Sequence, residues 1–250
     1  MSEETVLRVN KLKKEFGGLV AVKEVSFEIK SGELVGLIGP NGCGKSTTFN
    51  CISGLLKQTS GEIEAFGIDI SDMRPDQIQK LGFTRTFQHT RLWRQMTVIE
   101  NLMVPPRKQF SPNILLSLLL PKSRPNEKIR LTNAYDALDQ LEVPHMAHNL
   151  ASELSGGQKQ AVMMARALAF KPALLLFDEP TSAMDGLTEA NIIKHLAEQL
   201  NNRTLVIVTH KMPVVAMCDR VIVMDQGRIV GDGTKDAYFE LLRKQSEKKN

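Results

Sequence analysis

Short apolar runs that alternate with helix-like segments organise most of the chain. The runs are Leu34–Gly39, Leu174–Asp178, Leu205–Thr209 and Arg220–Asp225, and a helical pattern from Lys45 to Leu56 follows the first of them. Continuous apolar runs are typical of strands that are buried on both faces. The alternation therefore predicts an α/β fold in which a mostly parallel sheet is covered by helices.

Two regions depart from this pattern. Near the N-terminus, Val6–Leu12 and Val25–Ile29 alternate polar and apolar residues, which predicts half-exposed antiparallel strands and a mixed sheet at that end. From about Arg91 to Ser152 the strand-like runs disappear and the pattern becomes helical, which predicts an inserted helical subdomain. Prolines interrupt this region at Pro105, Pro106, Pro112, Pro121, Pro125 and Pro144.

The length and the pattern together predict one domain of 250 residues with internal subdivisions. We expect a core with its antiparallel β subdomain at 1–88 and 159–240, a helical subdomain at 89–158, and a basic tail at 241–250. A solvated tail is the favoured interpretation of these basic residues, and no nucleic-acid partner is expected.

Composition limits the class of protein and its cellular location. Hydrophobic residues make up 42% of the chain and charged residues 24%, as in ordinary globular proteins. The longest apolar stretch, Ile114–Leu120, is far shorter than the roughly 20 residues that cross a bilayer. The acidic N-terminus does not resemble a secretory signal, and three cysteines without metal-ligand spacing are expected to be free thiols. These features predict a cytoplasmic protein.

A glycine-rich segment between an apolar strand and a helix carries the first chemical signal. Its sequence from Gly39 to Ser46 is GPNGCGKS, the pattern of a phosphate-binding loop. Glycines let successive backbone N–H groups face one anion, Lys45 supplies charge to the β- and γ-phosphates, and Ser46 offers a hydroxyl to Mg²⁺. Alone, the loop indicates only that a nucleotide is bound. The candidate binding residues are Gly39, Pro40, Asn41, Gly42, Cys43, Gly44, Lys45, Ser46 and Thr47.

An apolar strand that ends in two acids gives the second signal. In the run Leu174–Glu179, Asp178 is a candidate Mg²⁺ ligand, and Glu179 is a candidate general base that polarises the attacking water. The alternative is an acidic pair that merely caps the turn before Pro180. The phosphate-binding loop favours the catalytic interpretation.

The segment LSGGQ, Leu154–Gln158, precedes a helical run from Lys159 to Phe170. Ser155 is predicted to cap this helix, and the two glycines expose backbone N–H groups. The segment is thus a candidate second anion-binding helix terminus, although an ordinary capped helix would have the same sequence features. The residues concerned are Ser155, Gly156, Gly157 and Gln158.

Taken together and in this order, these motifs resemble the ATP-binding cassette (ABC) family over nearly the whole chain. The resemblance implies a RecA-like P-loop NTPase core, ATP and Mg²⁺ as ligands, and ATP hydrolysis. It also implies that Phe16 stacks on adenine, that Gln88 touches Mg²⁺ and water, and that His210 contacts the γ-phosphate. A core aromatic is the alternative for Phe16, whose neighbours Gly17 and Gly18 leave the alignment loose.

The resemblance further implies a dimer. Ser182–Asp185 resembles the family's dimer-contacting loop, with Met184 where leucine is usual, and Asp185 joins the candidate nucleotide-binding residues. In the family, LSGGQ lies far from the phosphate-binding loop of its own chain, so a second copy or a homologous ATPase subunit completes the site. ATP then bridges two subunits, and hydrolysis lets the dimer open.

The family also implies integral-membrane permease subunits as partners, with the ATPase peripheral on the inner face of the cell membrane. The stretches Arg85–Arg94 and Met96–Leu102 are where the family's subunits receive a coupling helix, and exposed Leu92 and Trp93 are the expected anchors.

The chain resembles two kinds of transporter ATPase. From Phe83 to Leu102 and in the following insert it is similar to branched-chain amino-acid importer subunits, whereas Leu154–Leu168, Asp178–Asp185 and Val221–Val230 are more similar to type I secretion exporter domains. A natural divergent subunit and an engineered recombinant both fit this mosaic. We favour an importer-type subunit; an exporter-type domain and a soluble ABC ATPase without transport are the alternatives.

Overall fold

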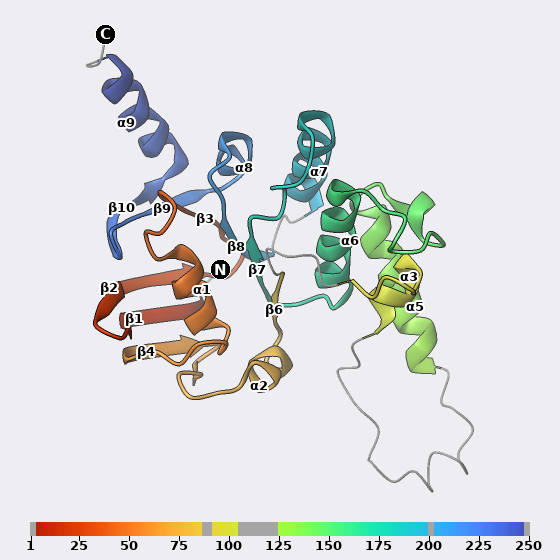
Figure 1. Ribbon diagram of the computed structural model, residues 1–250, viewed down its shortest axis with the longest axis horizontal. Helices are drawn as coiled ribbons and strands as arrows, with labels where there is room; N and C mark the ends of the chain where they lie inside the picture. The colour runs from red at the N-terminus through yellow and green to blue at the C-terminus, as the bar shows by residue number, and fades with distance from the viewer. Residues whose placement is uncertain (1–3, 87–91, 105–124, 200–202, 248–250) are drawn as a thin grey trace, which may run out of the picture. The chain divides into compact units, whose positions relative to one another are not determined.

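The computed structural model describes residues 4–86, 92–104, 125–199 and 203–247. The chain divides into two compact units (Figure 1). The first unit falls within Met1–Gln88, Pro172–Pro180 and Leu200–Asn250, and the second within His89–Lys171 and Thr181–Gln199. Each unit is described below by itself.

A six-stranded sheet forms the centre of the first unit, with the strand order β10-β9-β3-β8-β7-β6. Neighbouring strands are parallel except for the antiparallel pair β9 and β10. All five residues of β3, of β7 and of β8 are buried, which explains their continuous apolar sequence. The strands are β3 (Leu34–Ile38), β6 (Phe83–Arg85), β7 (Leu174–Asp178), β8 (Thr204–Val208), β9 (Arg220–Asp225) and β10 (Arg228–Thr234).

The N-terminal strands form a separate antiparallel sheet of four strands in the order β2-β1-β4-β5. This confirms the predicted antiparallel β subdomain: the short turn at Gly17 and Gly18 folds β2 back on β1, and β4 pairs with the other edge of β1. Only the expectation of a mixed sheet at this end was wrong. The mixed character belongs instead to the six-stranded sheet, through its β9–β10 hairpin. The strands are β1 (Thr5–Phe16), β2 (Leu19–Lys30), β4 (Ser60–Ala65) and β5 (Ile68–Asp69).

One hydrophobic core joins both sheets of the first unit with α1 (Lys45–Ile52). Phe49 of α1 is fully buried there, together with Leu12 and Leu174. The helix ends at Ile52 rather than at Leu56, because the next turn contains Gly54 at φ +70°, a left-handed conformation that ends an α-helix. The other helices described in this unit are α2 (Pro75–Lys80), α8 (Met212–Ala216) and α9 (Lys235–Glu247).

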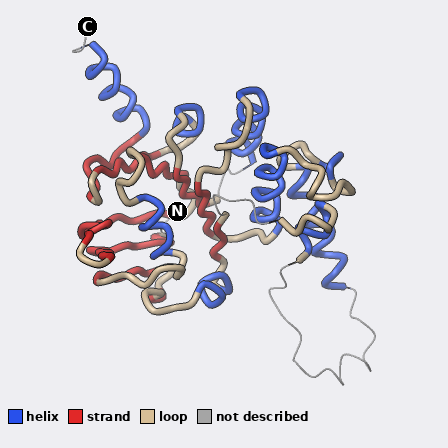
Figure 2. The backbone as a smooth tube through the Cα atoms, in the orientation of Figure 1, coloured by secondary structure: helices blue, strands red, loops and turns tan. Residues whose placement is uncertain are grey.

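The described residues of the second unit form helices and loops (Figure 2). Small and branched residues such as Ala134, Ala161 and Val162 are buried where α5 and α6 pack together. The boundary that we expected at 158 falls inside α6, and α6 packs against α3 and α5 of this unit. The helices are α3 (Val98–Met103), α5 (Pro125–Asp139), the 3₁₀ turn η1 (Pro144–Met146), α6 (Gly156–Ala169) and α7 (Gly186–Gln199).

No helix among the described residues is both long and apolar enough to span a membrane. The apolar stretch Ile114–Leu120 lies outside the described residues.

Candidate functional site

The phosphate-binding loop connects β3 to α1 in a conformation that requires glycine. Gly39 has φ +146°, and a Cβ atom there would lie 2.1 Å from the carbonyl oxygen of Met224. Gly44 has φ +108°, and its Cβ atom would lie 2.7 Å from the carbonyl oxygen of Ala21. Both the backbone angles and the close packing exclude a side chain. The neighbouring β9–β10 and β1–β2 hairpins therefore fix the shape of the loop.

Lys45 is the first residue of α1 and is only 7% exposed. Its ammonium group donates to the carbonyl oxygens of Gly39 at 2.7 Å and Pro40 at 2.9 Å. The charge is thus held against the loop by the loop's own backbone. Ser46, the residue expected to offer a hydroxyl to Mg²⁺, is exposed beside it.

Asp178 ends β7 with a carboxyl group that is bonded on one side only. The residue is 3% exposed, and its Oδ2 atom accepts a hydrogen bond of 2.7 Å from Nη2 of Arg85. Its Oδ1 atom is buried and has no hydrogen-bond partner within the part of the chain that the structure describes. Buried polar atoms are nearly always hydrogen-bonded, so this oxygen is a candidate ligand for a bound group.

The residues present fit Mg²⁺ bound together with a nucleotide. Within the described ranges no three His, Cys, Asp or Glu side chains come together as a metal site. Mg²⁺ in nucleotide sites is usually held by one or two protein oxygens together with phosphate oxygens and water. Asp178 Oδ1 and the exposed hydroxyl of Ser46 are suited to supply the protein share.

Glu179 and His210 follow adjacent parallel strands and meet at the carboxyl ends of these strands. The backbone register pairs Asp178 of β7 with Val208 of β8. The Glu179 carboxylate accepts a hydrogen bond from Nδ1 of His210 at 3.0 Å. The Glu179 side chain is 12% exposed and that of His210 is 61% exposed. Glu179 also has φ +49°, a costly conformation for a non-glycine residue and one that clusters at functional sites.

Phe16 lies at the end of β1 and is 43% exposed, so it is not a core aromatic. The ammonium group of Lys14 lies 5.0 Å from the centroid of its ring. The ring is accessible for stacking, and its contact with adenine stays a prediction. Gln88 lies outside the described residues.

The LSGGQ segment caps α6 as predicted from the sequence. The Ser155 hydroxyl accepts from the backbone N–H of Gln158 at 3.2 Å, and the Gln158 side chain accepts from the backbone N–H of Ser155 at 2.8 Å. This reciprocal capping box leaves the first turn of a 14-residue helix exposed at Ser155 and Gly156. An exposed helix N-terminus carries partial positive charge and free N–H groups.

A side chain that sequence analysis missed fixes the neighbouring loop. The amide of Gln160 is 6% exposed; it donates to the Ser182 hydroxyl at 2.7 Å and accepts from the backbone N–H of Ala183 at 2.8 Å. Gly157 is buried beside this loop. The available signal was a glutamine on the otherwise apolar face of a predicted helix.

Asp185 ends this loop and begins α7. Its carboxylate accepts from the backbone N–H groups of Leu187 at 3.1 Å and Thr188 at 3.0 Å, and from the Thr188 hydroxyl at 2.7 Å. The hydrogen bonds from Thr188 lower the pKa of the Asp185 carboxyl group. Asp185 is therefore built as an ionised helix cap on an exposed loop.

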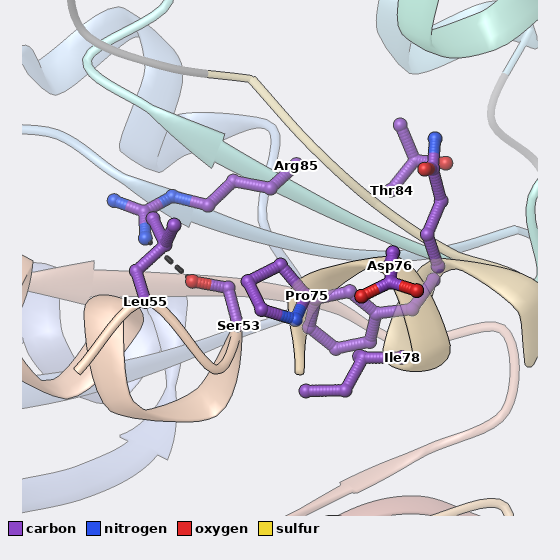
Figure 3. Close-up of a pocket in the computed structure, with 9 residues that line it drawn as sticks. Ser53, Leu55, Pro75, Asp76, Ile78, Thr84 and Arg85 are labelled. Carbon is purple, nitrogen blue, oxygen red and sulfur yellow. Dashed lines mark hydrogen bonds between the residues drawn. The ribbon is translucent and has the colours of Figure 1, made fainter. Parts of the chain in front are cut away.

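Arg85, at the end of β6, was also not among the predicted site residues. Burial lowers the pKa of its guanidinium group, while the hydrogen bond and the charge of Asp178 raise it. The group stays charged, because arginine does not deprotonate in proteins. Arg85 lies at one wall of a pocket of about 260 Å³ (Figure 3). The lining residues are Ser53, Leu55, Pro75, Asp76, Ile78, Gln79, Phe83, Thr84 and Arg85.

The structure thus divides the predicted residues between the units. Lys45, Asp178, Glu179 and His210 belong to the first unit, where their strands are neighbours in one sheet. Ser155 to Gln158 and the loop that ends at Asp185 belong to the second unit.

Comparison with known proteins assigns the family. The family model described as ABC transporter matches residues 22–182, more than half of the chain. The chain belongs to the ABC transporter family, and it is an ATP-binding and ATP-hydrolysing subunit.

Three curated relatives indicate the kind of transporter. A high-affinity branched-chain amino acid transport ATP-binding protein, LivG of Salmonella typhimurium, is 36% identical over 93% of both chains. BraF of Pseudomonas aeruginosa, which has the same description, is 33% identical over 92% of both chains. The methionine import protein MetN of Carboxydothermus hydrogenoformans is 41% identical over 88% of this chain, which spans 62% of MetN.

Two solved structures are similar over the whole fold. One is a dimeric, post-hydrolysis ATP-binding cassette bound to ADP and Pi, with a TM-score of 0.77 and 30% identity over 92% of this chain and 98% of that chain. The other is cbiO1 of Clostridium perfringens, part of the transporter complex cbiONQ, with a TM-score of 0.79 and 29% identity over 97% and 94% of the two chains. LivG and BraF align with both halves of this chain, and none of these comparisons shows the exporter-like character of the second half.

Proposed function

We propose that this chain hydrolyses Mg²⁺-ATP as one of two ATPase subunits that drive the import of branched-chain amino acids. Three features of one unit carry this proposal: an ammonium group held by the loop after β3, a buried carboxylate with an unbonded oxygen, and a Glu–His pair. They follow or end β3, β8 and β7, which are consecutive strands of one sheet. This combination serves phosphate binding, metal binding and activation of water.

Each residue has one step in the proposed mechanism. The loop N–H groups and Lys45 hold the β- and γ-phosphates. They stabilise the charge that develops on ADP as the water oxygen bonds to the γ-phosphorus and the bond from the γ-phosphorus to the β,γ-bridging oxygen breaks. Glu179 accepts the proton of the attacking water, and its hydrogen bond to His210 orients the carboxylate. Mg²⁺, held by Ser46 and Asp178, would neutralise developing phosphate charge when bound. Phe16 would stack on the adenine ring.

The second subunit is proposed to bring its LSGGQ helix terminus to the γ-phosphate. Three observations support this: the N-terminus of α6 is capped yet exposed, the loop to Asp185 is fixed beside it by Gln160, and a similar cassette is a dimer. An exposed terminus of a 14-residue helix is suited to an anion that a second molecule carries.

A mixing experiment tests this arrangement. Ser155→Asp keeps a helix-capping side chain but places negative charge where the phosphate is proposed to bind, and Lys45→Ala disables the loop. Each variant alone should lose ATP hydrolysis. A mixture of the two should recover activity, because one of the two sites in a mixed dimer then combines an intact loop with an intact LSGGQ segment. Failure to recover in proven mixed dimers would contradict a shared site.

The membrane partner is proposed to contact the segment that contains Trp93. This side chain is 48% exposed, and its backbone is fixed by the fully buried Asn101, which bonds to both the N–H and the carbonyl group of Trp93. Leu92 is half-buried rather than exposed. An exposed aromatic on a rigid backbone is a typical interface anchor. The subunit would then sit on the cytoplasmic face of the membrane, as a peripheral part of a permease complex.

The proposed substrate class comes from LivG and BraF, which match this chain over 93% and 92% of their lengths, whereas MetN extends well beyond it. The test is to purify the chain with the integral-membrane subunits that accompany it and to reconstitute the complex in liposomes. ATP-dependent uptake of labelled leucine, isoleucine or valine is expected. Uptake of methionine instead, or export of a polypeptide, would reject this substrate.

A further inference from the structure

We propose that Arg85 is a positioning residue that orients the Asp178 carboxylate for Mg²⁺. The inference deepens the proposed function and depends on it. It concerns a side chain outside the phosphate-binding loop, which we propose acts through Asp178. Its role is to hold one oxygen of Asp178 so that the other is presented.

The backbone places these two side chains together. Strand β6 is the edge strand beside β7, and Arg85 pairs in register with Leu176. The backbone N–H of Thr86 continues the pairing through a 2.9 Å hydrogen bond to the Leu176 carbonyl. The Arg85 side chain can therefore reach the end of β7, and Nη2 lies 2.7 Å from Asp178 Oδ2. Their side chains are only 7% and 4% exposed.

The guanidinium group is itself fixed by the helix that begins at Lys45. Its Nη1 atom donates to the Asn50 side-chain oxygen and to the Ser53 hydroxyl, both at 2.8 Å. The Ser53 contact is the dashed line in Figure 3. The guanidinium carbon of Arg85 also lies over the Phe49 ring, 5.6 Å from the ring centroid. Arg85 therefore connects α1, which carries the phosphate-binding lysine, to the carboxylate of β7.

This arrangement decides which oxygen of Asp178 is available. Arg85 holds Oδ2, and Oδ1 is buried without a partner among the described residues. Lysine would keep the charge, but a single ammonium group does not reproduce the planar guanidinium that contacts Asp178, Asn50 and Ser53 at once.

The test measures metal binding separately from nucleotide binding. Mn²⁺ serves as a spectroscopic substitute for Mg²⁺, and its affinity for the protein–ADP complex is followed by electron paramagnetic resonance. Fluorescent ATP analogue binding in EDTA reports the metal-free nucleotide affinity. The variants are Arg85→Lys, Arg85→Gln and Ser53→Ala. Arg220→Lys is the matched control, because Arg220 joins Asp232 and Glu33 in a partly buried ion-pair cluster elsewhere in the same unit.

Arg85→Lys should weaken Mn²⁺ binding about 10-fold or more, the usual effect of losing a group that orients a metal ligand. Metal-free nucleotide affinity should stay within about twofold of wild type, since the guanidinium hydrogen bonds to Asp178, Asn50 and Ser53 act on the metal side of the site. Ser53→Ala should weaken Mn²⁺ binding less, in the same direction, and it carries the test if Arg85→Gln does not fold. Arg220→Lys should leave both affinities unchanged even if it lowers the melting temperature.

Two results would overturn the inference. One is wild-type Mn²⁺ affinity in folded Arg85→Lys and Ser53→Ala proteins. The other is an equal loss of metal-dependent and metal-free nucleotide binding, which would show a merely structural role. A wild-type protein that binds neither Mn²⁺ nor nucleotide would instead reject the proposed function, and this inference with it.

Discussion

The two units use polar groups in opposite ways. In the first unit the key contacts join residues far apart in the sequence: Arg85 with Asp178, and Glu179 with His210. Three of these four side chains are almost fully buried or half-buried. In the second unit the LSGGQ segment and Asp185 bond to partners within three residues, in the pair Ser155–Gln158 and in the cap of α7, whereas buried Gln160 is the long-range exception. The capping residues Ser155 and Asp185 lie at the surface.

This difference indicates that the two units have different roles in ATP hydrolysis. The buried, long-range contacts of the first unit hold an unbonded carboxylate oxygen and a strained glutamate, features that cost stability and are kept where chemistry occurs. In the second unit the helix caps are bonded within their own segments, and the N-terminus of α6 is exposed. The first unit is thus expected to bind and activate the nucleotide, and the second to supply a contact to a nucleotide held by another molecule. Three predictions test that contrast, and a fourth tests burial within the first unit.

Glu179→Gln should have the largest effect. It removes the proposed base but keeps the shape and a hydrogen bond to His210, so hydrolysis should fall by about 10²- to 10⁴-fold with ATP affinity nearly unchanged. Gel filtration with ATP should then show a dimer. Glu142→Gln is the control, because Glu142 pairs with His195 at 3.0 Å in the second unit, and this change should leave hydrolysis intact. Undiminished turnover in Glu179→Gln would remove Glu179 from its role.

Lys45→Ala should act on binding rather than on a chemical step. Charge-assisted hydrogen bonds to phosphate contribute about 1.5–3 kcal/mol, so ATP should bind about 10- to 100-fold more weakly in a calorimetric titration. Lys235→Ala is a suitable control, since Lys235 also donates to a backbone carbonyl, that of Ala216 at 3.2 Å, but on the last helix. Equal affinity of Lys45→Ala and wild type would contradict the assigned role.

Gln160→Ala tests the second unit. The change leaves the Ala183 N–H without its acceptor, so the free energy of unfolding should fall by about 1–3 kcal/mol in urea. ATP affinity of the monomer should not change, whereas ATP-induced dimerisation of a Glu179→Gln background should weaken. Gln77→Ala, which breaks the capping box of α2 in the first unit, should affect stability alone. A fall in monomer ATP affinity with Gln160→Ala would contradict the division between the units.

The smallest effect concerns two buried thiols of the first unit. Burial raises the pKa of Cys51 to about 11 and that of Cys218 to about 12. The thiols ionise more readily in the unfolded chain, so their stabilisation is complete at neutral pH and is lost as pH rises from about 9 toward the folded pKa values. Unfolding free energies measured from pH 8 to 10 should fall by about 1 kcal/mol less in Cys218→Ala than in wild type. An equal fall in the free energy of unfolding of wild type and Cys218→Ala over this pH range would contradict the prediction.

Much of the first unit could be predicted because its elements are local in sequence. The apolar runs at Leu174–Asp178 and Arg220–Asp225 coincide with β7 and β9. In the second unit, Ser155 caps α6 as expected, for the same reason. The antiparallel β subdomain was predicted, whereas the expected mixed sheet at that end was wrong, because alternation shows that a strand is half-exposed but does not identify its partner strand. Arg85 and Gln160 were missed for a related reason: their partners lie 93 and 22–23 residues away.

The sequence by itself determined the family, the phosphate-binding loop and the acidic strand end, since glycine spacing and apolar periodicity act over a few residues. Only the tertiary structure decided which oxygen of Asp178 bonds to Arg85 and which stays unbonded, and that Gln160 fixes the loop before Asp185. Those outcomes depend on strand order and on burial, because a buried charge or amide is stable only when the fold brings its partner within hydrogen-bond distance.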